Sequence, residues 1–91
     1  MEGKMTNNNL TYAEKSMIEI MLNERKEDKL DPEFEARIDK ILELFQAGES
    51  SQMAYYQRMI VIQQIELKLE TDLQPEAKEK FNKIRLKLLN I

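Results

Sequence analysis

Cysteine and histidine are both absent from this chain of 91 residues. Without cysteine the chain has no disulfide, no thiolate nucleophile and no cysteine ligand for zinc, and without histidine it lacks the commonest metal ligand and the usual acid–base side chain. Diiron sites in helical bundles also need a Glu-x-x-His motif. These absences exclude most hydrolases and metalloenzymes, so we expect a protein that is not an enzyme and that uses no metal or cofactor.

Long hydrophobic runs are absent as well. No run approaches the roughly 18 apolar residues that span a bilayer, and the opening MEGKMTNNN is too polar for a signal peptide. Residues 1–9 are polar and without hydrophobic period, so we expect them to be disordered. The lack of cysteine is compatible with a reducing compartment. We therefore expect a cytoplasmic protein that does not enter a membrane.

The charges are abundant and nearly balanced, with 14 lysines and arginines against 17 acidic residues and a net charge of −3. Non-specific binding to nucleic acid depends on clustered lysine and arginine, so this balance weighs against a nucleic-acid partner. The two halves differ, because residues 1–46 carry 7 basic and 11 acidic side chains and residues 47–91 carry 7 basic and 6 acidic ones. That asymmetry suits either head-to-tail packing or an acidic docking face.

Glycine and proline number only two each. Pro32 and Pro75 suit the first turn of a helix, Gly48 suits the position after a last turn, and the Thr11–Glu14 segment fits a capping box. The serine pair Ser50–Ser51 can cap the helix that follows. The sequence therefore predicts helices over residues 11–30, 32–47, 50–72 and 75–89.

Apolar residues recur at helical spacing in the second and fourth of these segments. Both show the pattern i, i+4, i+7 and i+11, which places side chains on one face of a helix. The pattern runs through Phe34, Ile38, Ile41 and Phe45, and again through Ala77, Phe81, Ile84 and Leu88. We expect these two faces to lie in the hydrophobic core.

The stretch RMIVIQQIELKLE, residues 58–70, is ambiguous. Apolar and charged residues alternate over residues 65–70 as in a strand, whereas the whole segment fits a helix that is buried on two sides. No other segment offers a partner strand, and an unpaired strand leaves its backbone polar groups unsatisfied, so we favour the helix. Gln63 and Gln64 interrupt the apolar run, either to fix the helix register through a buried hydrogen bond or to point outward.

Together these elements predict an all-α fold, a single domain over residues 10–91 in which the hairpins 10–48 and 50–91 form a four-helix bundle. An internal repeat of about 43 residues supports this design. Identical residues recur at that offset: Leu30, Pro32, Glu33, Lys40 and Ile41 correspond to Leu73, Pro75, Glu76, Lys83 and Ile84. The repeat fits either a duplication or the ordinary likeness of two amphipathic hairpins. Because the first and third helices have wide apolar surfaces, we also expect a dimer.

Tyr55, Tyr56, Arg58 and Met59 form the candidate partner-binding patch. Tyrosine, methionine and arginine are enriched at the centres of protein interfaces. Adjacent tyrosines on a helix cannot both face one core, which leaves at least one of them available for contact. The alternative is that both rings simply cover the core of the bundle.

Lys80, Lys83 and Lys87 form a basic strip on the last predicted helix, flanked by Lys78 and Arg85. One interpretation is a docking strip for an acidic partner. The other is an ordinary solvated face, helped by the attraction of cations to the C-terminus of a helix.

These features favour a small regulator or inhibitor that binds another protein through a helical face. The Asn, Lys, Ile and Glu bias resembles that of low-GC bacteria and their phages, which fits a mobile-element accessory protein. The alternative is a DNA-binding regulator or antitoxin with a helix-turn-helix over residues 41–59, in which Gln52, Gln57 and Arg58 face base edges. The many apolar residues at the start of its second helix weigh against that alternative.

Overall fold

A computed structural model describes residues 10–90 of the chain, so the predicted disorder of residues 1–9 lies outside the described residues. The described part folds into four α-helices and one short 3-10 turn, with no strand. The elements are α1 (Tyr12–Lys26), α2 (Pro32–Gln46), the turn η2 (Ser50–Gln52), α3 (Tyr55–Leu69) and α4 (Pro75–Leu89). The all-α prediction is confirmed, and the ambiguous segment is helical through Leu69.

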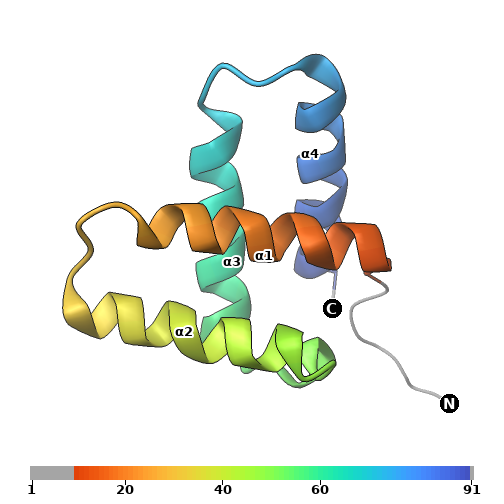
Figure 1. The fold of residues 1–91 in the computed structure, drawn as a ribbon. Coiled ribbons are helices and arrows are strands. Elements are labelled where there is room, and N and C mark those ends of the chain that lie inside the picture. The colour runs from red at the N-terminus through yellow and green to blue at the C-terminus, as the bar shows by residue number, and fades with distance from the viewer. Residues whose placement is uncertain (1–9, 91) are drawn as a thin grey trace, which may run out of the picture.

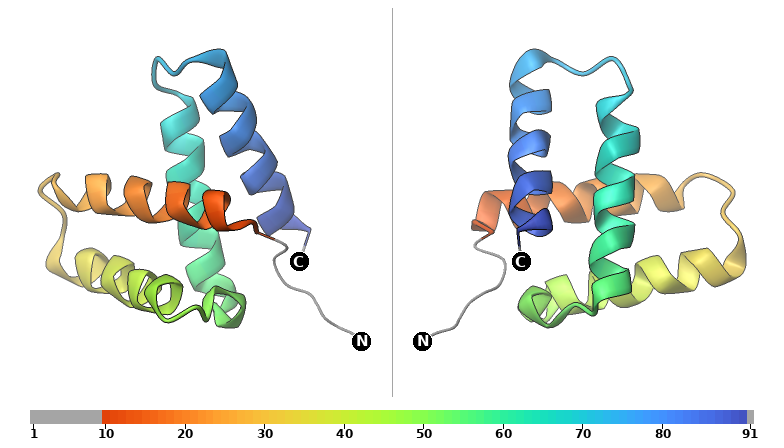
Figure 2. Two further views of the ribbon diagram at one scale, coloured as in Figure 1. Left: turned by 45° about the vertical axis from the view of Figure 1, so that its right-hand side comes forward. Right: turned by 180° about the vertical axis from the view of Figure 1, so that it is seen from behind.

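The helices form two antiparallel hairpins that lie in two layers. α1 and α2 make the first hairpin, α3 and α4 make the second, and the second hairpin crosses the first (Figure 1). Figure 2 shows the same crossing obliquely and from behind. The predicted bundle of two hairpins is confirmed, although the hairpins cross instead of lying parallel. None of the helices over residues 10–90 has the length and apolar character needed to cross a membrane.

Local sequence explains most of the helix boundaries. At α1 the Thr11 hydroxyl accepts a hydrogen bond from the Glu14 N–H at 3.1 Å, and the Glu14 carboxylate accepts one from the Thr11 N–H at 2.8 Å. This is the predicted capping box. Pro32 and Pro75 occupy the first positions of α2 and α4. Gly48 follows α2 with a φ of 73°, a left-handed conformation that favours glycine.

The predicted start of the third helix at residue 50 is wrong. Ser50 and Ser51 do not cap α3 but lie in η2, where Ser50 is buried. The helix begins after Ala54, whose backbone is extended and whose N–H donates a hydrogen bond of 2.8 Å to the Gln57 side chain. Gln57 thus supplies half of a capping box and fixes the first turn. α1 and α3 also end a few residues before the predicted positions 30 and 72.

The core lies between the hairpins and follows the predicted spacing. The buried apolar residues of α2 and α4 are Ile38, Ile41, Leu42, Phe45, Phe81, Ile84 and Leu88. Phe34 and Ala77, at the first positions of the two patterns, are only half-buried. The core lies where the hairpins meet. It also contains Ile18 and Leu22 of α1, which have no exposed area.

α3 is buried on two sides because it packs against both α1 and α4. Val61 and Ile65 form the centre of its buried surface and have no exposed area. Ile62 is also buried, whereas Met59 and Leu67 are exposed. The apolar residues of α3 therefore extend beyond its buried surface and reach solvent.

The helix boundaries reproduce the period of 43 residues. α1 begins at Tyr12 and α3 at Tyr55, and the starts of α2 and α4 and the ends of both pairs of helices differ by the same 43 residues. Fully buried positions recur as well, with Ile18 and Val61 as one such pair. The two hairpins share one local design, and their origin by duplication stays a prediction.

Replacing Ile65 should test the packing of α3. We expect Ile65→Ala to lower the free energy of unfolding by about 3 kcal/mol, because it leaves a cavity beneath both α1 and α4. Ile65→Val should cost about 1 kcal/mol and keeps the measurement possible if the alanine variant does not fold. Leu67→Ala, at a residue that is 45% exposed, is the control and should cost less. Urea unfolding followed by circular dichroism measures all three, and equal losses at the two positions would contradict the packing of α3.

Candidate functional site

The predicted patch lies at the start of α3, where large side chains face solvent. Tyr55 is 68% exposed, Tyr56 is 52% exposed and Met59 is 37% exposed. The Arg58 guanidinium lies 5.4 Å from the centroid of the Tyr55 ring, within the range of a cation–π interaction. The alternative in which both tyrosines cover the core is wrong, because more than half of each residue is in solvent.

The spacing of α3 explains why this patch faces outward. Gln57 and Val61 take the inward positions of the first two turns, so Tyr56 and Arg58 project to either side of them. Gln57 also accepts a hydrogen bond from the Ala54 N–H. The patch is therefore carried on a helix whose start is capped and whose inner face is buried, which fixes the backbone beneath it.

The segment 41–59 departs from a DNA-binding helix-turn-helix. Residues 47–54 separate α2 from α3 and include η2, whereas the DNA-binding motif uses a turn of roughly three or four residues. Gln57, one of the three side chains predicted to face bases, is buried and bonded to Ala54. α3 also packs against both α1 and α4, which covers part of the surface that a recognition helix needs.

The predicted basic strip on α4 divides into two parts. Lys80 and Lys83 are exposed. Lys87 instead turns toward α1, where its Nζ lies 2.7 Å from Glu14 Oε1. Arg85, predicted to flank the strip, pairs with Glu66 of α3 at 3.8 Å. Lys80 and Lys83 are therefore the part of the strip that faces solvent, and its docking role stays a prediction.

Glu14 is the buried end of the contact with Lys87, and its carboxylate has two partners. It accepts a hydrogen bond from the Thr11 N–H within the cap and another from Lys87 across the molecule. Burial alone raises the pKa of Glu14, but the hydrogen bonds from Lys87 and Thr11 outweigh burial and hold this pKa below its ordinary value. The contact ties the first turn of α1 to the last turn of α4.

A shallow groove of about 340 Å³ opens between the C-terminal halves of α1 and α3. Its lining comes equally from the two helices and the turns that follow them, and the lining residues are Met21, Glu24, Arg25, Asp28, Gln64, Leu67, Lys68 and Thr71. The first four and the last four differ by 43 positions, one for one. The groove therefore lies where equivalent parts of the two hairpins meet.

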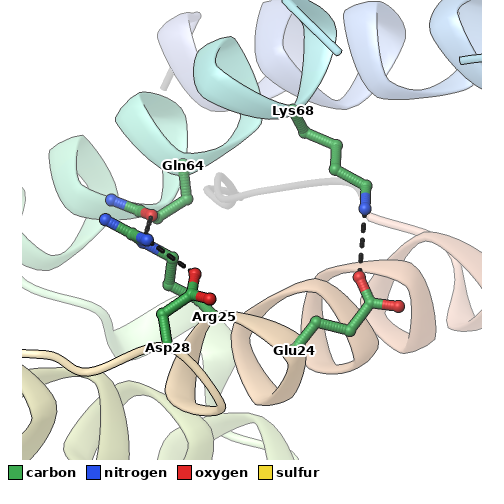
Figure 3. A network of polar contacts seen from close by, with 5 residues as sticks. All are labelled: Glu24, Arg25, Asp28, Gln64 and Lys68. Atoms are coloured by element: carbon green, nitrogen blue, oxygen red, sulfur yellow. Dashed lines mark hydrogen bonds and ion pairs between the residues drawn. The ribbon is translucent and has the colours of Figure 1, made fainter. Parts of the chain in front are cut away.

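Polar contacts join the hairpins along this groove (Figure 3). Arg25 Nε donates a hydrogen bond of 2.9 Å to Oε1 of the buried Gln64, and Arg25 Nη1 lies 2.9 Å from Asp28 Oδ2. Lys68 Nζ lies 3.0 Å from Glu24 Oε1. Each cation of the groove thus has an acidic partner, and the groove is the polar edge of the contact between α1 and α3. No cluster of metal-binding side chains occurs among residues 10–90.

Gln64 has one of the two roles predicted for the glutamine pair, a buried hydrogen bond, and Gln63 is exposed. Sequence reasoning did not identify Arg25 as the donor, because the two residues lie 39 positions apart. The interruption of an apolar run by a polar residue was the only local signal for this contact.

Acid should weaken the fold through Glu14. A carboxyl group whose pKa is lower in the folded than in the unfolded state stabilises the fold above its unfolded-state pKa, and this contribution is lost as the pH falls through the folded-state value. Glu14→Gln keeps an acceptor for the Thr11 N–H, as Gln57 does at Ala54, but removes the titrating group. At neutral pH we expect the free energy of unfolding of the variant to be about 1 kcal/mol lower than that of the native chain. When the pH is lowered below about 4, the free energy of unfolding should fall less for the variant than for the native chain. Urea unfolding across that range measures the difference, and parallel pH profiles would exclude this role.

The bond between Arg25 and Gln64 should show strong coupling. Arg25→Met leaves the buried Gln64 oxygen without its donor and should cost about 2 kcal/mol, whereas replacing both residues by Met removes the unsatisfied group as well. We therefore expect the double variant to be more stable than the sum of the single losses indicates. Urea unfolding of the four proteins of this cycle gives the coupling energy, and additive losses would show that the bond does not contribute.

Comparison with known proteins adds no assignment to these surfaces. The chain was compared with protein families, with curated proteins and with solved structures, and no match was found. The functional conclusion therefore rests on the chemistry of the described residues: the exposed patch at the start of α3, the solvent-facing lysines of α4 and the groove between α1 and α3.

Proposed function

We propose that the protein is a small non-enzymatic regulator or inhibitor that binds a partner protein in the cytoplasm through the start of α3. The observation that carries the proposal is the exposed group of Tyr55, Tyr56 and Met59 with Arg58 beside them. Burying these apolar surfaces against a partner would be favourable, because large aromatic and apolar side chains gain free energy when they leave water.

The residue types support a protein partner. Tyrosine offers a large contact area with few rotatable bonds, and tyrosine and arginine dominate the residues whose loss weakens known interfaces most. Arg58 is already placed over the Tyr55 ring, so little side-chain freedom remains to be lost on binding. The patch thus combines apolar area with a positive charge that favours an acidic rim on the partner.

The first hairpin supports the same conclusion by comparison. Ala13 stands at the position equivalent to Tyr56, and Ser16 at the position equivalent to Met59. α1 therefore forms its first turns with small side chains where α3 has large apolar ones. Helix formation does not explain Tyr56 and Met59 at exposed positions, and contact with a partner does.

Capture of the partner should depend on the patch. The immobilised full chain is used to capture proteins from the source cells, and bound proteins are identified by mass spectrometry. We then expect Tyr55→Ala with Arg58→Glu to weaken binding of the captured partner at least about tenfold, because these changes remove an aromatic contact and reverse a charge at the centre of the patch.

The matched control is Tyr12→Ala with Lys15→Glu, which makes the same changes at the equivalent positions of α1. Circular dichroism confirms that both variants fold. Equal binding by the native chain and the α3 variant would rule out the patch as the binding site. Binding of the native chain to heparin or duplex DNA, falling steeply with salt, would favour the DNA-binding alternative instead.

A further inference from the structure

The second hairpin carries large apolar side chains on its outer face. Met59 of α3 is 37% exposed, and Leu86 and Leu89 of α4 are 50% and 47% exposed. The ion pair between Glu66 and Arg85 shows that these sides of α3 and α4 adjoin, because Met59 lies two helical turns before Glu66 and the two leucines share one side of α4 with Arg85. We call this surface the outer face: Tyr56, Met59, Gln63, Glu66, Glu70, Arg85, Leu86 and Leu89.

The first hairpin is an internal control for this surface. Ser16, Glu43 and Gln46 stand at the positions equivalent to Met59, Leu86 and Leu89, and all three are polar. The helices that carry them have the same lengths and boundaries as their counterparts. The first hairpin exposes Ile20 at the position equivalent to Gln63, but the fold of a hairpin does not require apolar side chains at the positions of Met59, Leu86 and Leu89. Packing within the chain therefore does not explain these three residues of the outer face.

Charges on the outer face and beside it are complementary to a second copy of themselves. Arg58 lies at the beginning of α3, whereas Glu66 and Glu70 lie toward its end. When two copies of α3 pack antiparallel about a twofold axis near Gln63, the Arg58 end of each helix meets the Glu66–Glu70 end of the other. A twofold interface uses the same surface on both subunits, so one contact of this kind is made twice.

We propose that the outer face pairs with the outer face of a second copy of this chain, with the two α3 helices antiparallel. Met59, Leu86 and Leu89 then cover one another at the centre, and Arg58 faces Glu66 of the copy. A helix of 15 residues is roughly 22 Å long, so a face two helices wide lies at the small end of stable interfaces. We therefore expect a dimer that dissociates on dilution.

Self-association has a consequence for partner binding. Tyr56 and Met59 belong both to the partner-binding patch and to the outer face, and Arg58 of the patch also contacts the copy, so the two interactions exclude each other. The dimer is then the resting form, and dilution or partner binding releases the patch. This consequence rests on the proposed function, whereas the dimer itself does not.

Light scattering after size-exclusion chromatography and sedimentation equilibrium of the full chain test the dimer. We expect the native chain to be dimeric at high concentration, and Leu89→Glu to raise the dimer dissociation constant at least tenfold by placing a charge in the apolar centre. Gln46→Glu, the equivalent change in the first hairpin, is the control and should leave the dimer unchanged. A native chain that stays monomeric at the highest soluble concentration, or a dimer insensitive to Leu89→Glu, would overturn the proposal.

Reversed charges test the antiparallel arrangement. Arg58→Glu and Glu66→Arg should each weaken the homodimer, because both place like charges opposite each other. A mixture of the two variants should regain the dimer, since both contacts between positions 58 and 66 of the two copies again join an arginine to a glutamate. The Glu66→Arg chain loses its own pair with Arg85 in the homodimer and in the mixture alike, so that loss does not affect the comparison. Failure of the mixture to associate would refute the antiparallel pairing. Arg58→Glu also changes the partner-binding patch, so capture of the partner is compared instead with Leu89→Glu and Glu66→Arg, which lie outside that patch. Capture by a chain that stays monomeric would refute the dimer and leave the proposed function standing, so the two failures are distinguishable.

Discussion

The contact between α1 and α3 is the one on which the rest of the structure depends. Neither hairpin can enclose its apolar side alone, and the crossing of α1 over α3 brings the two sides together (Figure 1). Ile18, Val61 and Ile65 lose all solvent exposure in this core. The hydrogen bond from Arg25 to the buried Gln64 adds direction to this contact, because a misplaced crossing would leave that amide unsatisfied. This crossing therefore also determines which sides of the helices face solvent.

Much of the fold could be predicted because its local signals agree. The two prolines, the capping box at Thr11 and the glycine at position 48 mark boundaries through backbone chemistry that needs no distant partner. The start of α3 could not be predicted in the same way. Ser50 offers a hydroxyl suited to capping, yet it is buried in η2, and the side chain that caps Ala54 belongs to Gln57, a residue with no strong signal of its own. The start of α3 therefore depends on tertiary packing, which buries Ser50 and leaves Gln57 to bond to Ala54.

The candidate site was predictable to a similar extent and for a similar reason. Tyr55 and Tyr56 were identified because neighbouring rings cannot share one side of a helix, and that rule is local. The position of Lys87 within the basic strip could not be predicted, because this side chain contacts Glu14, 73 positions away along the chain. No periodicity within α4 contains that information. Arg25 escaped notice for the same reason, since only the crossing of the hairpins brings it to Gln64.

The first turns of α1 and α3 are built alike but differ in one group. Glu14 can gain a proton, whereas Gln57, which bonds to Ala54 in the same manner, cannot. Protonation of Glu14 weakens the cap of α1 and its tie to Lys87 together, while the start of α3 keeps its cap. Because the pKa of Glu14 lies below its ordinary value, this weakening needs a strongly acidic solution. The tie between the start of α1 and the end of α4 is then weaker, whereas the hydrogen bond that caps α3 does not depend on a titrating group.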